Sequence, residues 1–336
     1  MPVMIMQHGI YPRPRGLARA ISRFSSGKMS QEDLERVYEK YTERFFKLLK
    51  GLGYDRFSDG MFRWDDIFNP LISGIGGVVV NGLRRFYDNN YFFRQPIVRG
   101  RISYGEPKIS RMLAKSLSIA RNLGIEPNRV SLSLAGPYTM ATNALIETSD
   151  YDVEKFMRDY TEKVIYSEIE GSLKEGVVNI DLHEPSIAVM GGAKLDAVRE
   201  IYEEIARNFP KARVWAIMYF GYNGEGVRMF REASTRFGNI GYVVDMVEAP
   251  ESAWNGLGEL LGVGGIGIAI INSRTTKMER YRDIASKLLK ALGGYEGDLY
   301  LTHNASLEFL PEKIAVRKLR LLRRFAIKIN RDVQKT

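Results

Sequence analysis

The sequence contains three histidines, His8, His183 and His303, and each ends a short run rich in β-branched or other apolar residues. Imidazole binds metal ions and exchanges protons near neutral pH, so three such side chains on one face of a fold could form a site. No His-x-His or His-x-x-x-His spacing supports a local metal site. The alternative is that each histidine caps its strand and hydrogen-bonds a neighbouring loop.

Carboxylates and a tyrosine follow the same kind of run. We expect His183, Glu184 and Asp59 as acid–base candidates, because such groups transfer protons when their pKa values are tuned. Substrate-binding candidates are His8, Asp181 and Tyr219, and Glu248 and His303 are the remaining potential metal ligands. Imidazoles beside carboxylates should have raised pKa values, whereas burial acts in the opposite direction. An anionic ligand is therefore predicted to bind better at mildly acidic pH.

Basic residues gather at two places in the chain. Arg13, Arg15 and Arg19 follow the first apolar run, and Pro12 and Pro14 hold that segment extended. Arg13 and Arg15 could clamp a carboxylate or phosphate group, or they could belong to a solvated loop and helical turn. The stretch 317–328 is also basic, and a packed final helix with a charged outer face explains it better than nucleic acid or lipid binding.

Short β-rich runs alternate with longer amphipathic stretches along the chain, which is typical of a parallel sheet covered by helices. Helices are expected at 30–49, 152–174, 195–208, 276–292 and 311–330, the first capped by Ser30 with Asp33 and the last begun by Pro311. Strands are expected at 3–8, 54–58, 130–135, 177–183, 213–219, 240–247, 264–271 and 298–303.

Eight such strands predict an α/β fold of the (β/α)₈ TIM-barrel class, with an open doubly wound sheet as the alternative. No glycine-rich dinucleotide fingerprint follows the first strand. In a barrel the polar residues that end the strands meet at one face, and the first and eighth strands are neighbours. His8 and His303 are therefore expected within a few ångströms of each other.

The connection between the second and third strands is too long for a simple loop. Within it, 83–87 and 96–100 are extended pieces that could pair as a β-hairpin-like arm over the barrel mouth. No change in composition marks a linker, so we expect one domain over 1–336 with an insertion at about 60–128.

Composition excludes several classes of function. The chain has no cysteine, so disulfides, thiolate metal sites and cysteine nucleophiles are excluded. Its net charge of +9 favours an anionic small molecule or another acidic partner. No apolar stretch could span a membrane and the N-terminus lacks the features of a signal peptide, so a cytoplasmic protein is expected. Only four glutamines occur, which favours a thermophilic source.

Six motifs in order resemble the cobalamin-independent methionine synthase family across nearly the whole chain. Residues 9–13 (Gly-Ile-Tyr-Pro-Arg) resemble its Gly-Ser-Phe-Pro-Arg turn, and 134–139 (Leu-Ala-Gly-Pro-Tyr-Thr) match its Leu-x-Gly-Pro-x-Thr turn. Residues 181–185 (Asp-Leu-His-Glu-Pro) stand where the family has Gln-Ile-Asp-Glu-Pro. The other three motifs lie at 27–34, 58–66 and 85–91. Full-length members carry two related barrels, and this chain resembles the N-terminal barrel, which holds no zinc.

The resemblance implies that zinc is not expected. The positions that carry the zinc-binding His-x-Cys pair of the catalytic barrel hold Ile217 and Tyr219, and its late cysteine falls on Ala305. Glu248 alone matches a ligand of that site. The positions implied for homocysteine are also changed, because they hold Ile10, Met61 and His183. Methylation of homocysteine by this chain alone is therefore not expected.

Three functions remain open. The resemblance implies a stand-alone counterpart of the N-terminal barrel that serves methionine biosynthesis by binding a folate- or pterin-type methyl carrier, or by assisting a separate zinc-containing methionine synthase catalytic barrel. An independent barrel enzyme with a histidine and carboxylate site is the second hypothesis. A purely structural partner subunit is the third. Nucleic acid and membranes are not expected partners.

Overall fold

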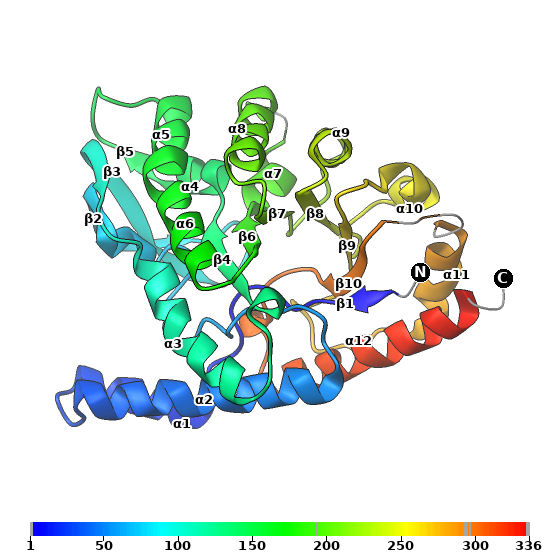
Figure 1. Cartoon of the computed structure of the whole chain (residues 1–336), viewed down its shortest axis with the longest axis horizontal. Helices are drawn as coiled ribbons and strands as arrows, with labels where there is room; N and C mark the ends of the chain where they lie inside the picture. The colour runs from blue at the N-terminus through cyan, green and yellow to red at the C-terminus, as the bar shows by residue number, and fades with distance from the viewer. Residues whose placement is uncertain (1–2, 192–193, 292–294, 296, 334–336) are drawn as a thin grey trace.

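A seven-stranded parallel sheet forms the centre of the protein (Figure 1). The computed structural model describes residues 3–191, 194–291, 295 and 297–333. The strand order is β1-β10-β9-β8-β7-β6-β4, so the first and last strands of the chain are neighbours, as the barrel prediction requires. The strands are β1 (Met4–Ile5), β4 (Ser131–Ala135), β6 (Asn179–His183), β7 (Arg213–Ile217), β8 (Ile240–Asp245), β9 (Ile266–Ile271) and β10 (Leu299–His303).

The two edges of this sheet, β1 and β4, flank the same short segment. Parallel bridges join Met6 to Arg56 and Phe57 to Val130. The backbone N–H of Gln7 donates to the Arg56 carbonyl at 3.0 Å, and the N–H of Phe57 donates to the Arg129 carbonyl at 2.9 Å. The sheet therefore curls strongly, and the fold is an α/β fold of the TIM-barrel type.

The strand expected at 54–58 is present only as these two bridges. Ser58 leaves the ladder because its backbone N–H and its hydroxyl both donate to the side-chain carbonyl of Gln7, each at 3.1 Å. The other expected strands are confirmed, and β4, β6, β9 and β10 end at the expected residues, whereas β1, β7 and β8 end earlier. β7 stops at Ile217 and β8 at Asp245, because the chain then turns into the loops of the mouth.

Helices cover the outside of the curled sheet (Figure 1). The expected cap of α2 is confirmed, since the Ser30 side chain accepts a hydrogen bond from the backbone N–H of Asp33. Helices α5 and α6 are joined by a π-helical turn, Thr161–Ile165, and together fill the stretch expected to be one helix. The helices are α1 (Arg15–Ser25), α2 (Gln31–Leu52), α3 (Lys108–Asn122), α4 (Pro137–Asn143), α5 (Val153–Tyr160), α6 (Tyr166–Lys174), α7 (Pro185–Met190), α8 (Leu195–Asn208), α9 (Gly224–Phe237), α10 (Glu251–Asn255), α11 (Tyr281–Ala291) and α12 (Glu312–Val333).

The sequence did not predict α1, α3, α9 or the short helices α4, α7 and α10, and the helix expected at 276–292 begins later, at Tyr281. Residue 292 of that expected helix lies outside the described residues. Helix α9 contains Gly224 and Gly226 in its first turn, which lowers its helix propensity. A Cβ atom at Gly226 would lie 2.7 Å from a methyl carbon of Ile187, so the glycine permits close packing of this helix. Tertiary packing thus overrides the local preference.

A separate antiparallel hairpin stands beside the sheet. Strands β2 (Ile75–Arg85) and β3 (Phe92–Tyr104) pair with each other, and β3 also pairs in parallel with the short β5 (Leu145–Ile146). The two extended pieces do not pair with each other as expected, because 83–85 of β2 pairs with 92–94, and 96–98 of β3 pairs with 78–80. The turn of this hairpin reaches the carboxyl ends of the barrel strands through Tyr91, whose hydroxyl donates to Glu308.

The last helix, α12, packs its apolar side against the barrel, as the sequence predicts. One basic residue of its predicted outer face, Lys318, is instead fully buried. Its ammonium group donates to the carbonyls of Asn272 and Lys277 and pairs with Glu279 at 2.7 Å. Within the described residues, no helix is long and apolar enough to cross a membrane.

Candidate functional site

The three histidines meet at the carboxyl ends of β1, β6 and β10. The ring centroids of His8 and His303 are 4.4 Å apart, and those of His8 and His183 are 5.7 Å apart. The expected proximity of His8 and His303 is therefore confirmed. All three side chains are fully buried. We call this group the histidine cluster.

Backbone carbonyls fix the tautomers of two of the rings. Nε2 of His8 lies 2.9 Å from the carbonyl oxygen of His303, and Nδ1 of His303 lies 2.7 Å from that of Ala305. A carbonyl only accepts, so each of these nitrogens carries the proton. In the neutral rings, Nδ1 of His8 and Nε2 of His303 are then acceptors, and neither has a partner among the described residues. Neither ring nitrogen of His183 has a partner among the described residues, and in its neutral ring one nitrogen carries the proton and the other is an acceptor.

The histidines are neutral at physiological pH, contrary to the prediction from the sequence. Burial lowers the pKa of His8 well below its usual value, and the neighbouring His303 and His183 add to the effect. Burial, followed by repulsion from His303 and Arg56, lowers the pKa of His183 to about 3. Burial lowers the pKa of His303 to about 4. The predicted rise was wrong because the carboxylates are engaged elsewhere.

Asp181 forms a buried ion pair with Arg56 instead of facing a histidine. The guanidinium of Arg56 also lies 4.3 Å from the ring centroid of Trp215 and donates to Ser131 at 3.1 Å. Burial lowers the pKa of Arg56 to about 9, which still leaves it charged near neutral pH. This pair therefore supports the floor of the site and leaves the histidines without a charged partner.

Glu184 is likewise held by its own surroundings. Its carboxylate accepts hydrogen bonds from the backbone N–H groups of Tyr138 and Thr139, at 3.0 and 2.7 Å, in the first turn of α4. Burial nevertheless raises its pKa to about 7. Asp59 accepts from the hydroxyl of Ser116 at 2.7 Å and from the backbone N–H of Met61. Neither Glu184 nor Asp59 forms a hydrogen bond with a described residue of the histidine cluster.

An aromatic group roofs the cluster. Tyr219 stands edge-on to His183, with ring centroids 5.8 Å apart, and Phe220 packs on Tyr219 at 4.6 Å. The ring of Phe220 also contacts Tyr87 of the hairpin turn, at 5.9 Å. We call Phe86, Tyr87, Tyr219, Phe220 and Phe309 the aromatic roof.

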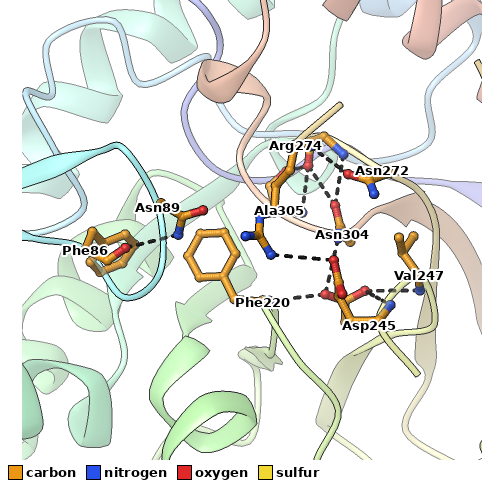
Figure 2. Close-up of polar contacts among 11 residues, drawn as sticks. Phe86, Asn89, Phe220, Asp245, Val247, Asn272, Arg274, Asn304 and Ala305 are labelled. Carbon is orange, nitrogen blue, oxygen red and sulfur yellow. Dashed lines mark hydrogen bonds and ion pairs between the residues drawn. The ribbon is translucent and has the colours of Figure 1, made fainter. Parts of the chain in front are cut away.

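Phe220 has a strained backbone, with φ of +72° in a region that favours glycine. Such strain persists only where the surroundings hold it, and it is common at functional sites. In this protein Asp245 stabilises the backbone of Phe220. Its carboxylate accepts hydrogen bonds from the backbone N–H of Phe220 at 3.1 Å and from the side chain of Asn304 at 3.3 Å (Figure 2). Burial raises the pKa of Asp245 to about 7.

Arg274 and Glu248 form a partly exposed ion pair at the edge of the roof, with nitrogen and oxygen 3.5 Å apart. The guanidinium of Arg274 lies 5.4 Å from the ring centroid of Phe220 (Figure 2). No role was predicted from the sequence for Asp245, Arg274, Asn304 or Phe220. Nothing in the local sequence marks Phe220, because its backbone conformation depends on Asp245, 25 residues further along.

The arginines after the first strand are not brought together as a clamp. Arg13 pairs with Asp65 at 2.9 Å and also donates to the carbonyl of Trp64. Arg15 and Arg19 are exposed on α1. The prediction that Arg13 and Arg15 bind an anion together therefore has no support from their contacts.

The residues at the positions implied for zinc do not fit that metal. Ile217 and Ala305 are buried and carry no donor atom, Tyr219 packs against His183, and Glu248 pairs with Arg274. Across the described part of the chain, no group of three or more His, Asp or Glu side chains is arranged to hold a metal ion. A single carboxylate does not supply the three or four ligands that protein zinc sites use.

The curled parallel sheet and a polar site at its carboxyl ends define an α/β barrel-type protein of the kind that binds small molecules at the mouth. No family model matches the chain. It is 25% identical to a methionine synthase from Sulfolobus acidocaldarius, over 93% of this chain and 87% of that protein. A methionine synthase from Pyrococcus abyssi is 24% identical over 93% of this chain and 88% of its own length.

Solved structures show the same fold. A B12-independent methionine synthase from Shewanella, solved in complex with selenomethionine, superposes over 100% of both chains with a TM-score of 0.79 and 18% identity. A methyltransferase from Methanosarcina mazei gives a TM-score of 0.56 with 13% identity, over 97% of this chain and 93% of that chain. The chain is thus similar over nearly its whole length to archaeal methionine synthases, and its fold is that of B12-independent methionine synthases.

Proposed function

We propose that this protein takes part in methyl transfer for methionine biosynthesis by binding a folate- or pterin-type methyl carrier at the mouth of the barrel. One observation carries the proposal: the bare acceptor nitrogens of His8 and His303 lie buried beneath the aromatic roof. A neutral, flat heterocycle with N–H donors suits such a place, because it stacks on aromatic rings and satisfies bare acceptors. The relatives' shared name, methionine synthase, supports the reaction class.

The histidine cluster, with Tyr219, binds the carrier in this proposal. His183 is the best acid–base candidate of the cluster, because neither of its ring nitrogens has a partner among the described residues. Asp181 acts indirectly by holding Arg56, and Glu184 and Asp59 shape the neighbouring loops. Arg274 lies beside the roof and is partly exposed, so it is better placed than Arg13 or Arg15 to meet an anionic tail.

A separate zinc-containing catalytic barrel supplies the thiol activation. A metal-bound thiol is deprotonated near neutral pH, which is what methylation of homocysteine requires. Ile217, Tyr219 and Ala305 provide no such ligand set here. In this proposal the protein is the carrier-binding partner of that barrel. Absence of binding in the titration described next would favour a purely structural subunit instead.

The test is a calorimetric titration with 5-methyltetrahydrofolate triglutamate. We expect saturable binding by the wild type, at least about tenfold weaker in His303→Ala, which corresponds to about 1.4 kcal/mol. Arg236→Ala, an exposed residue on α9, is the matched control and should bind like the wild type. The histidines stay neutral between about pH 5.5 and 8, so His303→Ala should not change the pH dependence of binding; any dependence over that range comes from Asp245 and Glu184, whose pKa values are about 7. Absence of binding, or equal binding by His303→Ala, would contradict the proposal.

We also propose that the fold is a complete eight-stranded barrel formed by one domain over 1–336, with the β2–β3 hairpin inside an insertion at about 60–128. The bridges at Arg56 and Phe57 support the closure. Limited proteolysis should then give no two separately stable halves. A cytoplasmic location and a thermophilic source remain expectations from composition.

A further inference from the structure

A wide groove lies between the α1–α2 pair and the β2–β3 hairpin, with a volume of about 600 Å³. Figure 1 shows these two helices running along one side of the molecule, with the hairpin above them. None of the residues that line the groove belongs to the histidine cluster or the aromatic roof. They include Ile21, Phe24, Leu34, Leu83, Phe92 and Arg94.

Both walls of the groove expose large apolar side chains. Leu83 and Phe92 on the hairpin are 67% and 52% exposed, and Phe24 on α1 is 37% exposed. Single exposed apolar residues are common on protein surfaces, but apolar residues gathered on both walls of a groove indicate a binding surface. Burying them would remove apolar area from water, which is the main driving force for association.

The hairpin wall alternates apolar and basic side chains. Leu83 pairs with Arg94, and Arg85 pairs with Phe92, in the antiparallel register. Directly paired residues lie on the same face of a sheet, and so do residues two apart along a strand. These four side chains therefore share one face, with the two arginines next to the two apolar residues.

Two of the three acidic residues of the groove are paired within the chain, and the third, Asp66, is buried and accepts hydrogen bonds from the side chain of Asn69 and the backbone N–H of Arg94. Glu35 pairs with Arg63 at 2.5 Å, and Asp65 pairs with Arg13 at 2.9 Å. By contrast, Arg94 forms no ion pair with any described residue, and Arg85 pairs only weakly with the exposed Asp88, at 3.4 Å. The groove thus offers unneutralised positive charge beside exposed apolar surface.

The same features decide between possible occupants. A second copy would place arginine against arginine if it used the same face, which is unfavourable. An added strand would need a regular edge, but the pairing of β2 is interrupted between Gly76 and Val78 and again between Val80 and Leu83. Such irregularities hinder strand addition. A helix laid into the groove needs no free backbone edge.

We propose that this groove is a docking site for an acidic amphipathic helix of a partner protein. The apolar side of that helix packs on Phe24, Leu83 and Phe92, and its carboxylates pair with Arg85 and Arg94. Charge complementarity sets the orientation and the rate of association. The proposal is independent of the carrier site, since the two surfaces share no residue.

The experiment measures fluorescence anisotropy of a labelled peptide of Leu, Glu and Ala with its leucines at helical spacing. We expect the full-length wild type to bind it and to reject the same peptide with Lys in place of Glu. The double variant Leu83→Ser/Phe92→Ser should bind at least about tenfold more weakly. Leu145→Ser, an exposed residue of β5 in the same small sheet, is the matched control and should bind like the wild type.

A charge reversal makes the test sharper. In Arg85→Glu/Arg94→Glu the preference should reverse, so that the Lys peptide binds better than the Glu peptide. Added salt should weaken the wild-type complex, because it screens exposed charges. Equal binding of both peptides by the wild type would overturn the proposal. Sedimentation showing a dimer that Leu83→Ser/Phe92→Ser dissociates would also overturn it and assign the groove to a second copy.

Discussion

His183 is buried with both ring nitrogens bare, and it faces His8, Tyr219, His303 and Arg56. Burial and the nearby positive charge favour its neutral form, so its pKa in the folded protein is about 3. In the unfolded chain the pKa is about 6.5. Between these two values the unfolded state binds a proton that the folded state does not, so acidification destabilises the fold.

We therefore predict that His183→Gln changes how stability depends on pH. The variant should gain stability relative to the wild type as pH falls below 6.5, by at most about 1.4 kcal/mol for each pH unit. Glu184 and Asp245 have raised pKa values and act in the opposite sense, but they are present in both proteins and cancel in the difference. Denaturant unfolding at several pH values measures this difference, and a constant difference would show that His183 is accessible to protons.

Gly136 leaves no room for a side chain beside Glu184. An added Cβ would lie 2.3 Å from the carboxyl carbon of Glu184, whose position is fixed by Tyr138 and Thr139. We predict that Gly136→Ala destabilises the protein by about 1–3 kcal/mol, as overpacking does. The control is Gly51→Ala on α2, where no atom lies within 4 Å. A melting curve of Gly136→Ala equal to that of the control would contradict the prediction.

At the residue level, the sequence predicted the histidine cluster but not its electrostatics. Polar residues at strand ends converge in any barrel, so the meeting of His8 and His303 followed from strand order alone. The partner of Asp181 could not be predicted, because Arg56 lies 125 residues away and in a segment that barely forms a strand. Burial of the whole mouth, which decides the sign of the pKa shifts, is a property of the packed molecule.

Among the elements, α12 is attached to the loop after β9 by Lys318. Lys318→Met would remove two hydrogen bonds to carbonyls and leave Glu279, whose side chain is 13% exposed, without its counter-charge. Breaking a buried pair by removing one partner costs about 3 kcal/mol or more. We predict this loss of unfolding free energy for Lys318→Met, as measured by denaturant unfolding. Lys313→Met, an exposed position on the same helix, should change stability by less than about 0.5 kcal/mol. Equal effects of the two substitutions would show that the buried pair contributes nothing.

The sequence predicts elements well where the hydrophobic period is regular. It located α8 without error and the central strands to within a few residues. It missed α9, because two glycines lie in the first turn of that helix. It also predicted a strand at 54–58 that is too long, because Ser58 forms hydrogen bonds with the side chain of Gln7 and does not continue the strand. Both errors come from contacts between distant segments, which local preferences do not contain.

For the whole molecule, the ordered motifs predicted a resemblance to methionine synthases, and both the similar sequences and the shared fold agree with it. The motifs did not predict how the mouth is filled. At the positions that the sequence resemblance implies for metal ligands, this chain has Ile217, Tyr219 and Ala305, and the carboxylate of Glu248 is paired with Arg274. The positive charge beside Glu248 therefore comes from an arginine of the chain, which stacks on Phe220.

The last prediction follows from the pairing of Glu248 with Arg274 instead of with a metal ion. The purified protein should hold far less than one zinc ion per chain and should not methylate homocysteine without a partner, because one carboxylate cannot replace a set of three or four ligands. Restoring donors in the triple variant Ile217→His/Tyr219→Cys/Ala305→Cys should raise the zinc content towards one ion per chain, since the three positions lie at or just after the carboxyl ends of β7 and β10, and Glu248 follows β8, the strand beside β7. Elemental analysis after purification without chelators measures both, and circular dichroism checks that the variant is folded. Stoichiometric zinc in the wild type that is lost in Glu248→Gln would contradict the prediction, and it would mean that the Arg274 pair opens to admit a metal.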